Sequence, residues 1–264
     1  MLKLTNITKT FNPGTITEKK ALRGIDLTLE DGDFVTVIGG NGAGKSTLLN
    51  LIAGVHYTDT GSIELDGMNL THKPEYYRAR FLGRVFQDPM MGTAANMGIE
   101  ENLAMAYRRG KRRGLKWHIK SSEKDIYKNQ LKLLDLGLEN RMTAKVGLLS
   151  GGQRQALTLL MAVMSKPEIL LLDEHTAALD PSNAEIVMNL TKEFANEYNL
   201  TVMMITHNMQ HAISYGNRLI MMDKGEIILD ISGKEKENLT LEDLNLRFRQ
   251  IRKTSITTDR LVLQ

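Results

Sequence analysis

The sequence has no cysteine among its 264 residues. This absence excludes disulfide frameworks, thiolate metal sites and thiol nucleophiles, and it fits a reducing compartment. Long apolar runs are also missing, since no window approaches the roughly 18 consecutive apolar residues of a membrane-spanning helix. The first residues, MLKLTNITKTF, lack the apolar core of a secretory signal. We therefore expect a chain that is soluble by itself.

The sequence also lacks a large charge excess of either sign. Its formal net charge is +3 and its isoelectric point is about 8.9. Nucleic-acid binding would require basic residues clustered over a whole face, so no nucleic-acid partner is expected. With 42% hydrophobic and 25% charged residues, the composition is that of an ordinary globular protein of one or two domains.

The order of the hydrophobic patterns predicts an α/β fold. The first third of the chain alternates or runs apolar, which predicts a β-rich part. Residues from about 90 to 165 have helical spacing and predict an inserted α-helical subdomain. Apolar runs at 169–173 and 201–206 flank a helical pattern, which is typical of a parallel sheet with crossover helices. Residues 219–230 predict a hairpin, and the tail from residue 233 is charged and polar.

The segment GGNGAGKST at 39–47 matches a phosphate-binding loop. An apolar strand pattern precedes it and a helical pattern follows it, which is the context that such a loop needs. Its glycines let backbone N–H groups surround a phosphate, Lys45 can reach the β- and γ-phosphates, and the Ser46 hydroxyl can bind Mg²⁺. The candidate nucleotide-binding residues here are Gly39, Gly40, Asn41, Gly42, Ala43, Gly44, Lys45, Ser46 and Thr47.

The segment ILLLDE at 169–174 supplies a second part of such a site. Its apolar residues predict a buried strand, and Asp173 follows at the carboxyl end, where open α/β sheets bind ligands. Asp173 can hold Mg²⁺, and Glu174 can orient and polarise an attacking water. An acidic pair after a strand is otherwise common at a helix N-terminus.

Two further polar residues also follow short apolar runs. His207 could contact the γ-phosphate, and Gln87 could sense Mg²⁺ or water. From the sequence alone, His207 could equally be a hydrogen-bonded structural histidine, and Gln87 could equally be an ordinary surface residue. Both interpretations stay open at this point.

The stretch LLSGGQRQ at 148–155 predicts a second phosphate site, because a serine and two glycines precede a helical pattern. One phosphate loop surrounds a phosphate from one side only. If a second copy of the chain presents Ser150 and the following glycines, the γ-phosphate is enclosed from both sides. The stretch therefore predicts a dimer that sandwiches two nucleotides.

Together these residues resemble the ATP-binding subunits of bacterial ABC transporters over roughly residues 1–232. The resemblance rests on six elements in order, namely GGNGAGKST (Walker A), Gln87 (Q-loop), LSGGQ at 149–153 (signature), ILLLDE (Walker B), AALD at 177–180 (D-loop) and His207 (switch histidine). It implies an α/β P-loop NTPase core with a mixed or parallel sheet and an N-terminal antiparallel β subdomain. The helical insertion would span about 90–165, and residues 233–264 would form a C-terminal tail.

The resemblance also implies ATP and Mg²⁺ as cofactors and a role for each site residue. Glu174, His207 and Lys45 would be catalytic, and Asp180 would connect two sites across the dimer. Phe11 stands where the family places an aromatic ring that stacks on adenine. The metal ligands would be Ser46, Gln87 and Asp173, and a second copy would contribute Ser150, Gly151, Gly152 and Gln153.

The chain departs from the family at His175, where a proline is usual. We expect the histidine to be tolerated. The run DEHTAALD is similar to a bacterial subgroup encoded beside a permease and a solute-binding lipoprotein, with some members linked to tryptophan or related aromatic amino acids. This implies a subunit at the cytoplasmic face of the plasma membrane that energises solute uptake through a permease and a solute-binding protein. Because every motif is intact, we expect a homodimer with two active sites, with a heterodimer as the alternative. The alternatives are an exporter of lipid or peptide and a soluble ABC ATPase without a transport role.

A basic stretch at 107–122, YRRGKRRGLKWHIKSS, surrounds the only tryptophan. It fits a solvated loop, and it also fits a segment that contacts anionic lipid headgroups, since the helical subdomain of this family faces the membrane. Nucleic-acid contact is the least favoured of the three interpretations.

Overall fold

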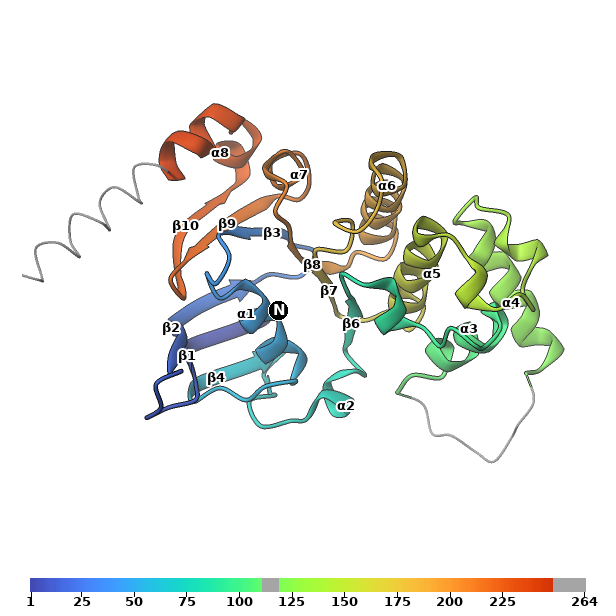
Figure 1. The fold of residues 1–264 in the computed structure, drawn as a ribbon, viewed down its shortest axis with the longest axis horizontal. Coiled ribbons are helices and arrows are strands. Elements are labelled where there is room, and N and C mark those ends of the chain that lie inside the picture. Colours follow the sequence, from blue (N-terminus) through green and yellow to red (C-terminus); the bar gives the residue numbers. More distant parts are fainter. Residues whose placement is uncertain (111–118, 249–264) are drawn as a thin grey trace, which may run out of the picture.

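The computed structural model describes residues 1–110 and 119–248, which build two sheets and a helical region (Figure 1). The N-terminal sheet is antiparallel, with strand order β2-β1-β4-β5. Its strands are β1 (Leu2–Phe11), β2 (Lys19–Leu29), β4 (Thr60–Leu65) and β5 (Met68–Asn69). The antiparallel N-terminal part that the sequence predicts is therefore present.

The second sheet is the core of the fold, with strand order β10-β9-β3-β8-β7-β6. Its strands are β3 (Phe34–Gly39), β6 (Leu82–Val85), β7 (Ile169–Asp173), β8 (Thr201–Ile205), β9 (Arg218–Asp223) and β10 (Glu226–Ser232). All neighbours are parallel except β10, which pairs with β9 as the predicted hairpin around Lys224 and Gly225. Strands buried on both faces need apolar residues throughout, which explains the continuous runs in β7 and β8.

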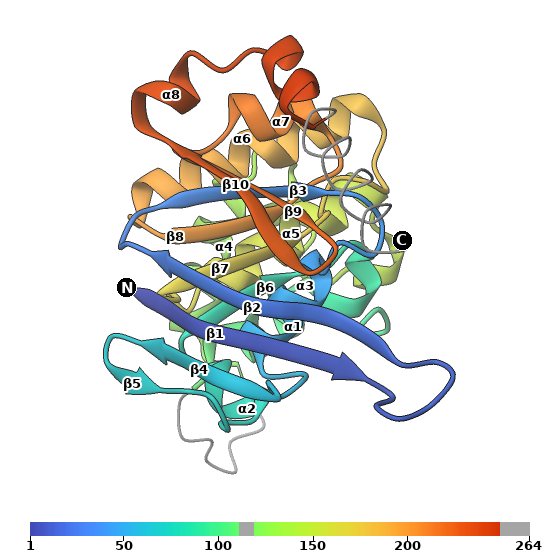
Figure 2. The same cartoon turned by 90° about the vertical axis from the view of Figure 1, so that its left-hand side faces the viewer.

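Helix α1 (Lys45–Ala53) packs in the core that the two sheets share (Figure 2). Leu48, Leu51 and Ile52 are buried there among side chains of both sheets. The carboxyl end of α1 is capped by the fully buried Arg78 of α2 (Glu75–Arg78), which donates to the carbonyl oxygens of Leu51 at 2.7 Å and Ile52 at 2.9 Å. The helix that begins at the phosphate loop is thus fixed at its far end.

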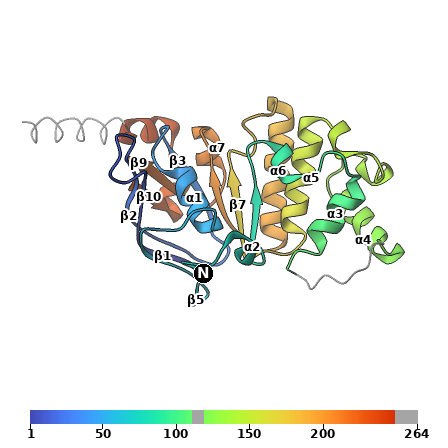
Figure 3. The ribbon, with the colours of Figure 1, turned by 60° about the horizontal axis from the view of Figure 1, so that its bottom comes forward.

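The helical region lies at the opposite end of the molecule from β1 and β2 (Figures 1 and 3). Its helices are α3 (Ile99–Tyr107), α4 (Ser121–Lys132) and α5 (Gly151–Val163), with short 3-10 turns at Pro89–Gly92, Leu138–Asn140 and Val146–Leu148. Helix α6 (Pro181–Glu197) packs beside α5 in the same core. None of the helices within residues 1–110 and 119–248 combines the length and the apolar character of a membrane-spanning segment.

Part of the basic stretch belongs to this region. Arg108 pairs with Glu123 at 2.8 Å, and burial lowers the pKa of Arg109. The Arg108 side chain is therefore engaged within the protein. Lys111, Arg112, Arg113, Lys116 and Trp117 lie outside the described residues, so the lipid contact stays a prediction.

The segment after β10 packs on the core as far as residue 248. It contains α8 (Gly233–Glu237) and helical residues 241–248, and it buries Leu239 and Leu244 against β9 and α7 (Met209–Ser214). The buried Lys236 donates to the carbonyl oxygens of Ile213 and Tyr215, each at 2.8 Å. The segment thereby caps α7, the helix that follows His207. Residues from 249 onward lie outside the described residues.

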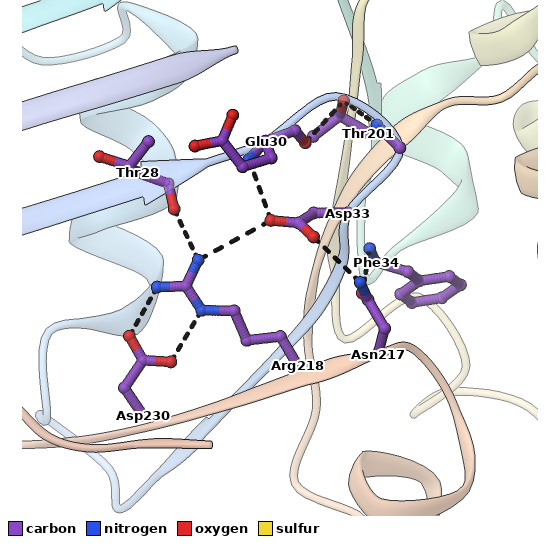
Figure 4. A network of polar contacts seen from close by, with 9 residues as sticks. Thr28, Glu30, Asp33, Phe34, Thr201, Asn217, Arg218 and Asp230 are labelled. Atoms are coloured by element: carbon purple, nitrogen blue, oxygen red, sulfur yellow. Dashed lines mark hydrogen bonds and ion pairs between the residues drawn. The ribbon is translucent and has the colours of Figure 1, made fainter. Parts of the chain in front are cut away.

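A polar network around Arg218 joins the two sheets (Figure 4). Arg218 of β9 donates to both carboxylate oxygens of Asp230 on β10, at 2.7 and 2.6 Å, and to the carbonyl oxygen of Thr28 on β2 at 2.6 Å. The Asp230 carboxylate raises the pKa of Arg218. Asn217 accepts from the Phe34 N–H at 2.8 Å and donates to Asp33 at 3.0 Å, which holds the start of β3. The start of β3, which leads into the phosphate loop, is therefore held by the residue that precedes β9.

Candidate active site

The phosphate loop connects β3 to α1 and curls because its glycines take conformations that other residues avoid. Gly42 and Gly44 have φ angles of 80° and 105°. A Cβ at Gly44 would lie 2.7 Å from the carbonyl oxygen of Ala21, so a side chain there would collide with backbone. Lys45 closes the loop by donating from Nζ to the carbonyl oxygens of Gly39 at 2.8 Å and Gly40 at 3.2 Å.

Three parallel strands bring the predicted catalytic groups to this loop. Strand β8 lies between β3 and β7, with Ile205 opposite both Val37 and Asp173. The phosphate loop, the Asp173–Glu174 pair and His207 therefore meet at one edge of the sheet, as the rule for open α/β sheets requires. They surround a cavity of about 170 Å³. Its lining residues are Lys19, Ala21, Asn41, Gly42, Ala43, Gly44, Lys45, Ser46, Thr47, Glu174 and His207.

The Asp173 carboxylate is half-buried and lies among donors. Burial raises its pKa, and the charges of Arg84 and Lys45 and a hydrogen bond from the Ser46 hydroxyl oppose that shift. Arg84 Nη2 is 3.9 Å from Asp173 Oδ2 and donates to Asn50 Oδ1 at 2.6 Å. Asp173 and Ser46 thus present two neighbouring oxygens, which is the donor chemistry that Mg²⁺ prefers.

Glu174 and His207 form a direct pair, Oε1 to Nε2, beside the cavity. Glu174 has a φ of 48°, an uncommon left-handed conformation for a residue with a side chain. Its N–H donates to the carbonyl oxygen of Ile205 at 3.1 Å, and its carbonyl oxygen accepts from the Ala177 N–H at 2.9 Å. Such a conformation persists only where the surroundings fix it, and it is typical of functional sites.

The positive charge of Lys45 is also shaped by this environment. Burial lowers the pKa of its ammonium group, and the carboxylates of Glu174 and Asp173 oppose that effect. The cavity is therefore lined by the buried Lys45 and the Glu174 carboxylate, and the Asp173 carboxylate at the end of β7 lies next to Lys45. This arrangement is suited to a polyphosphate that arrives with a divalent cation.

The signature segment lies away from this cavity. Ser150 caps α5, accepting from the Gln153 N–H at 3.2 Å, and the Gln153 side chain accepts from the Ser150 N–H at the same distance. Gly152 packs so tightly that an added Cβ would lie 2.4 Å from Asn183 Oδ1, and Asn183 in turn donates to Asp180 at 2.5 Å. The signature therefore packs on the Asp180 turn of its own chain and does not line its own phosphate cavity.

The other predicted residues that lie outside the cavity lining are Gly39, Gly40, Asp173, Gln87 and Phe11. Gln87 is exposed. Phe11 stands opposite Lys19 in the β1–β2 pair, with its ring edge-on to His56 at a centroid distance of 5.2 Å. Their roles toward metal and adenine stay predictions.

Three residues around the site were not predicted from the sequence, namely Lys19, Ala21 and Arg84. Only the strand register shows that Lys19 and Ala21 face the phosphate loop, so the sequence contained no usable signal for them. Arg84 could have been noticed, because a charge inside the short buried strand LGRV needs a partner.

The fold and the cavity define the class of the protein. A P-loop nucleotide hydrolase contains a glycine-rich phosphate loop, an Asp–Glu pair at the end of a nearby parallel strand and a histidine close to both. Here the pair follows β7, which lies two positions from β3 in the sheet. The sequence pattern of the family described as "ABC transporter" matches residues 22–177. The chain belongs to this family, as the resemblance predicted, and it is an ATP-binding and ATP-hydrolysing cassette.

Similar proteins and structures agree with this assignment. The Tyrosine transport ATP-binding protein of Clostridioides difficile is 44% identical over 94% of this chain and 98% of its own length. The Energy-coupling factor transporter ATP-binding protein EcfA2 of Clostridium perfringens is 32% identical over 95% and 87%. A nucleotide-free ATP-binding cassette has a TM-score of 0.76 at 29% identity, covering 92% of this chain and 95% of that chain. A dimeric cassette in a post-hydrolysis state with ADP and Pi has a TM-score of 0.75 at 29% identity, covering 88% and 98%.

Proposed function

We propose that the chain is the ATPase subunit of a bacterial importer of an amino acid, with aromatic amino acids as the favoured class. The convergence of Lys45, Glu174 and His207 on one cavity, with the Asp173 carboxylate next to Lys45, carries the ATPase part of the proposal. The solute part is supported by the relative named for tyrosine transport, which is similar over almost its whole length. The subunit would work at the cytoplasmic face of the membrane with a permease and a solute-binding protein.

In this proposal Ser46 and Asp173 hold Mg²⁺, since a hydrogen bond from the Ser46 hydroxyl already brings its oxygen close to the Asp173 carboxylate. Gln87 would complete the ligand set. The metal would supply charge neutralisation between the β- and γ-phosphates. Fewer than three acidic or histidine ligands come together among the described residues, which suits Mg²⁺ because this ion keeps several waters and phosphate oxygens as ligands.

The chain's own residues would act on ATP as follows. Backbone N–H groups of the phosphate loop and Lys45 hold the β- and γ-phosphates. Glu174 keeps Oε1 on His207 and offers Oε2 to the attacking water, and His207 turns one nitrogen toward the γ-phosphate. Phe11 stacks on adenine. Preorganised charge at the transferred phosphoryl group supplies most of the rate acceleration.

The same geometry supports a homodimer. Ser150 and Gly151 are exposed at the start of α5 and are absent from the cavity of their own chain. A second copy that presents Ser150, Gly151, Gly152 and Gln153 would enclose the γ-phosphate, and Asp180 would link the two sites. One of the similar solved cassettes is described as dimeric.

Two experiments test the proposal. Glu174→Gln should bind ATP, hydrolyse it at least about a hundredfold more slowly and form a stable ATP-dependent dimer in size-exclusion chromatography. Hydrolysis at the parent rate would refute the role of Glu174. Co-purification from detergent-solubilised membranes should recover a polytopic permease and a binding protein that takes tyrosine, phenylalanine or tryptophan. A permease with a large extracytoplasmic domain would indicate export, and soluble partners only would indicate a non-transport ATPase.

A further inference from the structure

Gln155 is a fully buried polar residue of α5 that the proposed mechanism does not use. It lies five positions after Ser150, on the helix that begins with the signature segment. Its side-chain amide lies between the segments that follow β6 and β7. A buried amide in a helix that is otherwise so apolar needs a physical reason.

The Gln155 amide group joins two backbone segments that flank the site. Its Nε2 donates to the carbonyl oxygen of His175 at 2.6 Å and to that of Phe86 at 3.1 Å. Both acceptors are carbonyl oxygens, so only the NH₂ end of the amide fits between them. His175 follows Glu174 and Phe86 precedes Gln87. The Gln155 side chain therefore contacts the residue next to Glu174 and the residue next to Gln87.

The other end of the Gln155 side chain supports a function beyond stability. Within residues 1–110 and 119–248, the buried Oε1 atom has no hydrogen-bond partner. An unpaired buried oxygen is destabilising. If position 155 served stability alone, an apolar residue of similar length would be more favourable there. The two hydrogen bonds that the Gln155 amide donates are therefore what distinguishes it from such a residue.

His175 is held from the opposite side by α6. Its Nε2 lies 3.2 Å from Thr191 Oγ1, and that hydroxyl donates its only hydrogen to the Val187 carbonyl oxygen at 2.8 Å. The His175 ring must therefore donate from Nε2. Residue 175 is thus tied to α5 through its backbone and to α6 through its ring.

We propose that Gln155 is a positioning residue that holds Glu174 in its left-handed conformation and couples it to the signature helix. The bonds to His175 and Phe86 fix the backbone on either side of the cavity, so a displacement of α5 moves the Glu174 turn and the Gln87 segment together. Binding of a second copy's nucleotide to Ser150 would therefore act on the position of Glu174 through α5 and Gln155. The inference rests on the catalytic role assigned to Glu174 in the proposed function.

The test compares Gln155→Met with Thr158→Val on the same helix. Methionine keeps the length of the side chain and removes both donors. Thr158 is also buried, but its hydroxyl donates only to the Arg154 carbonyl oxygen of α5, at 2.9 Å. For Gln155→Met we expect kcat to fall about tenfold or more, because small misplacements of a catalytic group are costly. The KM for ATP, and the affinity for a fluorescent ATP analogue, should stay within about twofold. Thr158→Val should change neither.

A second readout separates positioning from a general loss of structure. In a Glu174→Gln background, Gln155→Met should still form the ATP-dependent dimer, because nucleotide binding does not need the Gln155 bonds. An unchanged kcat, a change confined to KM, or equal losses in Thr158→Val would overturn the inference. If Gln155→Met does not fold, Thr191→Val removes the other anchor of His175 and should also lower kcat at constant KM.

The outcomes distinguish this inference from the proposed function. If Glu174→Gln hydrolyses ATP at the parent rate, the role of Glu174 fails and the positioning role fails with it. If Glu174→Gln is inactive while Gln155→Met has parental kcat and KM, only the role of Gln155 is refuted.

Discussion

His175 provides a quantitative test of how the turn after Glu174 is built. The side chain is 2% exposed and makes its hydrogen bond to Thr191 as a neutral ring. Burial, with a smaller contribution from the charge of His211, lowers the pKa of His175 from 6.5 to about 3. The imidazole should therefore stay neutral in the folded protein throughout the physiological range, and the turn should not respond to pH there.

The sign of the pH dependence follows from this shift. Below pH 6.5 the unfolded chain binds a proton at His175 that the folded chain does not, so the free energy of unfolding falls as the pH falls. Above pH 6.5 neither state binds the proton and the full stability is present. The slope approaches about 1.4 kcal/mol per pH unit, so this residue alone removes about 2 kcal/mol of stability between pH 7 and pH 5.

The assay compares the parent chain with His175→Gln, whose amide can keep a donor near Thr191 but does not titrate. Urea unfolding is measured at pH 5, 6, 7 and 8 with EDTA and without nucleotide. Burial also lowers the pKa of His211 and raises that of Asp173, but both residues are present in both chains and cancel in the difference.

The difference in unfolding free energy between the two chains should change by about 2 kcal/mol from pH 7 to pH 5, in the direction that favours the variant at low pH. Two parallel stability curves would refute the reasoning. They would mean that His175 takes up a proton in the folded state as readily as in the unfolded chain.

Three further substitutions test the site and its supports. Lys19→Ala should weaken ATP and ADP binding about fivefold in a nucleotide titration, because Lys19 lines the phosphate cavity, whereas its neighbour Lys20 is absent from that lining and Lys20→Ala should have no effect. Gly44→Ala should abolish nucleotide binding and destabilise the fold by about 1 to 3 kcal/mol, because Gly44 has a φ of 105° and lies against the Ala21 carbonyl group. Gly67→Ala is the control, since Gly67 has a φ of 75° but open space around it. Equal losses of stability in the two variants would show that the close contact at Gly44 is unimportant. Arg78→Met should lower the urea midpoint by the equivalent of about 3 kcal/mol, because it leaves several buried carbonyl groups without a donor.

The sequence predicted those features that depend on local pattern. Buried parallel strands need uninterrupted apolar residues, so 169–173 and 201–206 could be identified directly. The phosphate loop was equally predictable, because its glycines and lysine are required at fixed spacing around a phosphate. Asp173 and Glu174 followed from their place at the end of a strand.

Other features depend on contacts between distant segments and could not be predicted. Lys19 faces the phosphate loop only because of the register between β1 and β2 and the packing of β2 on α1. His175 was identified as a departure from the family, but its bonds to α5 and α6 depend on how two helices meet the turn. Arg78 is polar in sequence and fully buried in the structure, since it caps a helix that ends 25 positions earlier, at Ala53.

The position of the signature segment gives the dimer hypothesis a physical basis in a single chain. Gly152 is packed against Asn183, which is hydrogen-bonded to Asp180, so the signature and the Asp180 turn are packed together. The phosphate cavity of the same chain is open and lacks any donor from either segment. A second copy that covers the cavity with its signature would therefore also bring its Asp180 turn near Glu174.

Through Gln155, the helix behind each signature is bonded to the turn that holds Glu174 of its own chain. A nucleotide bound at one site would then affect the Glu174 carboxylates of both copies. It would contact one directly and act on the other through α5 of the second copy. We therefore expect the two sites of the dimer to hydrolyse ATP cooperatively. Mixed dimers of parent and Gln155→Met chains should lose that cooperativity while their ATP affinity is unchanged.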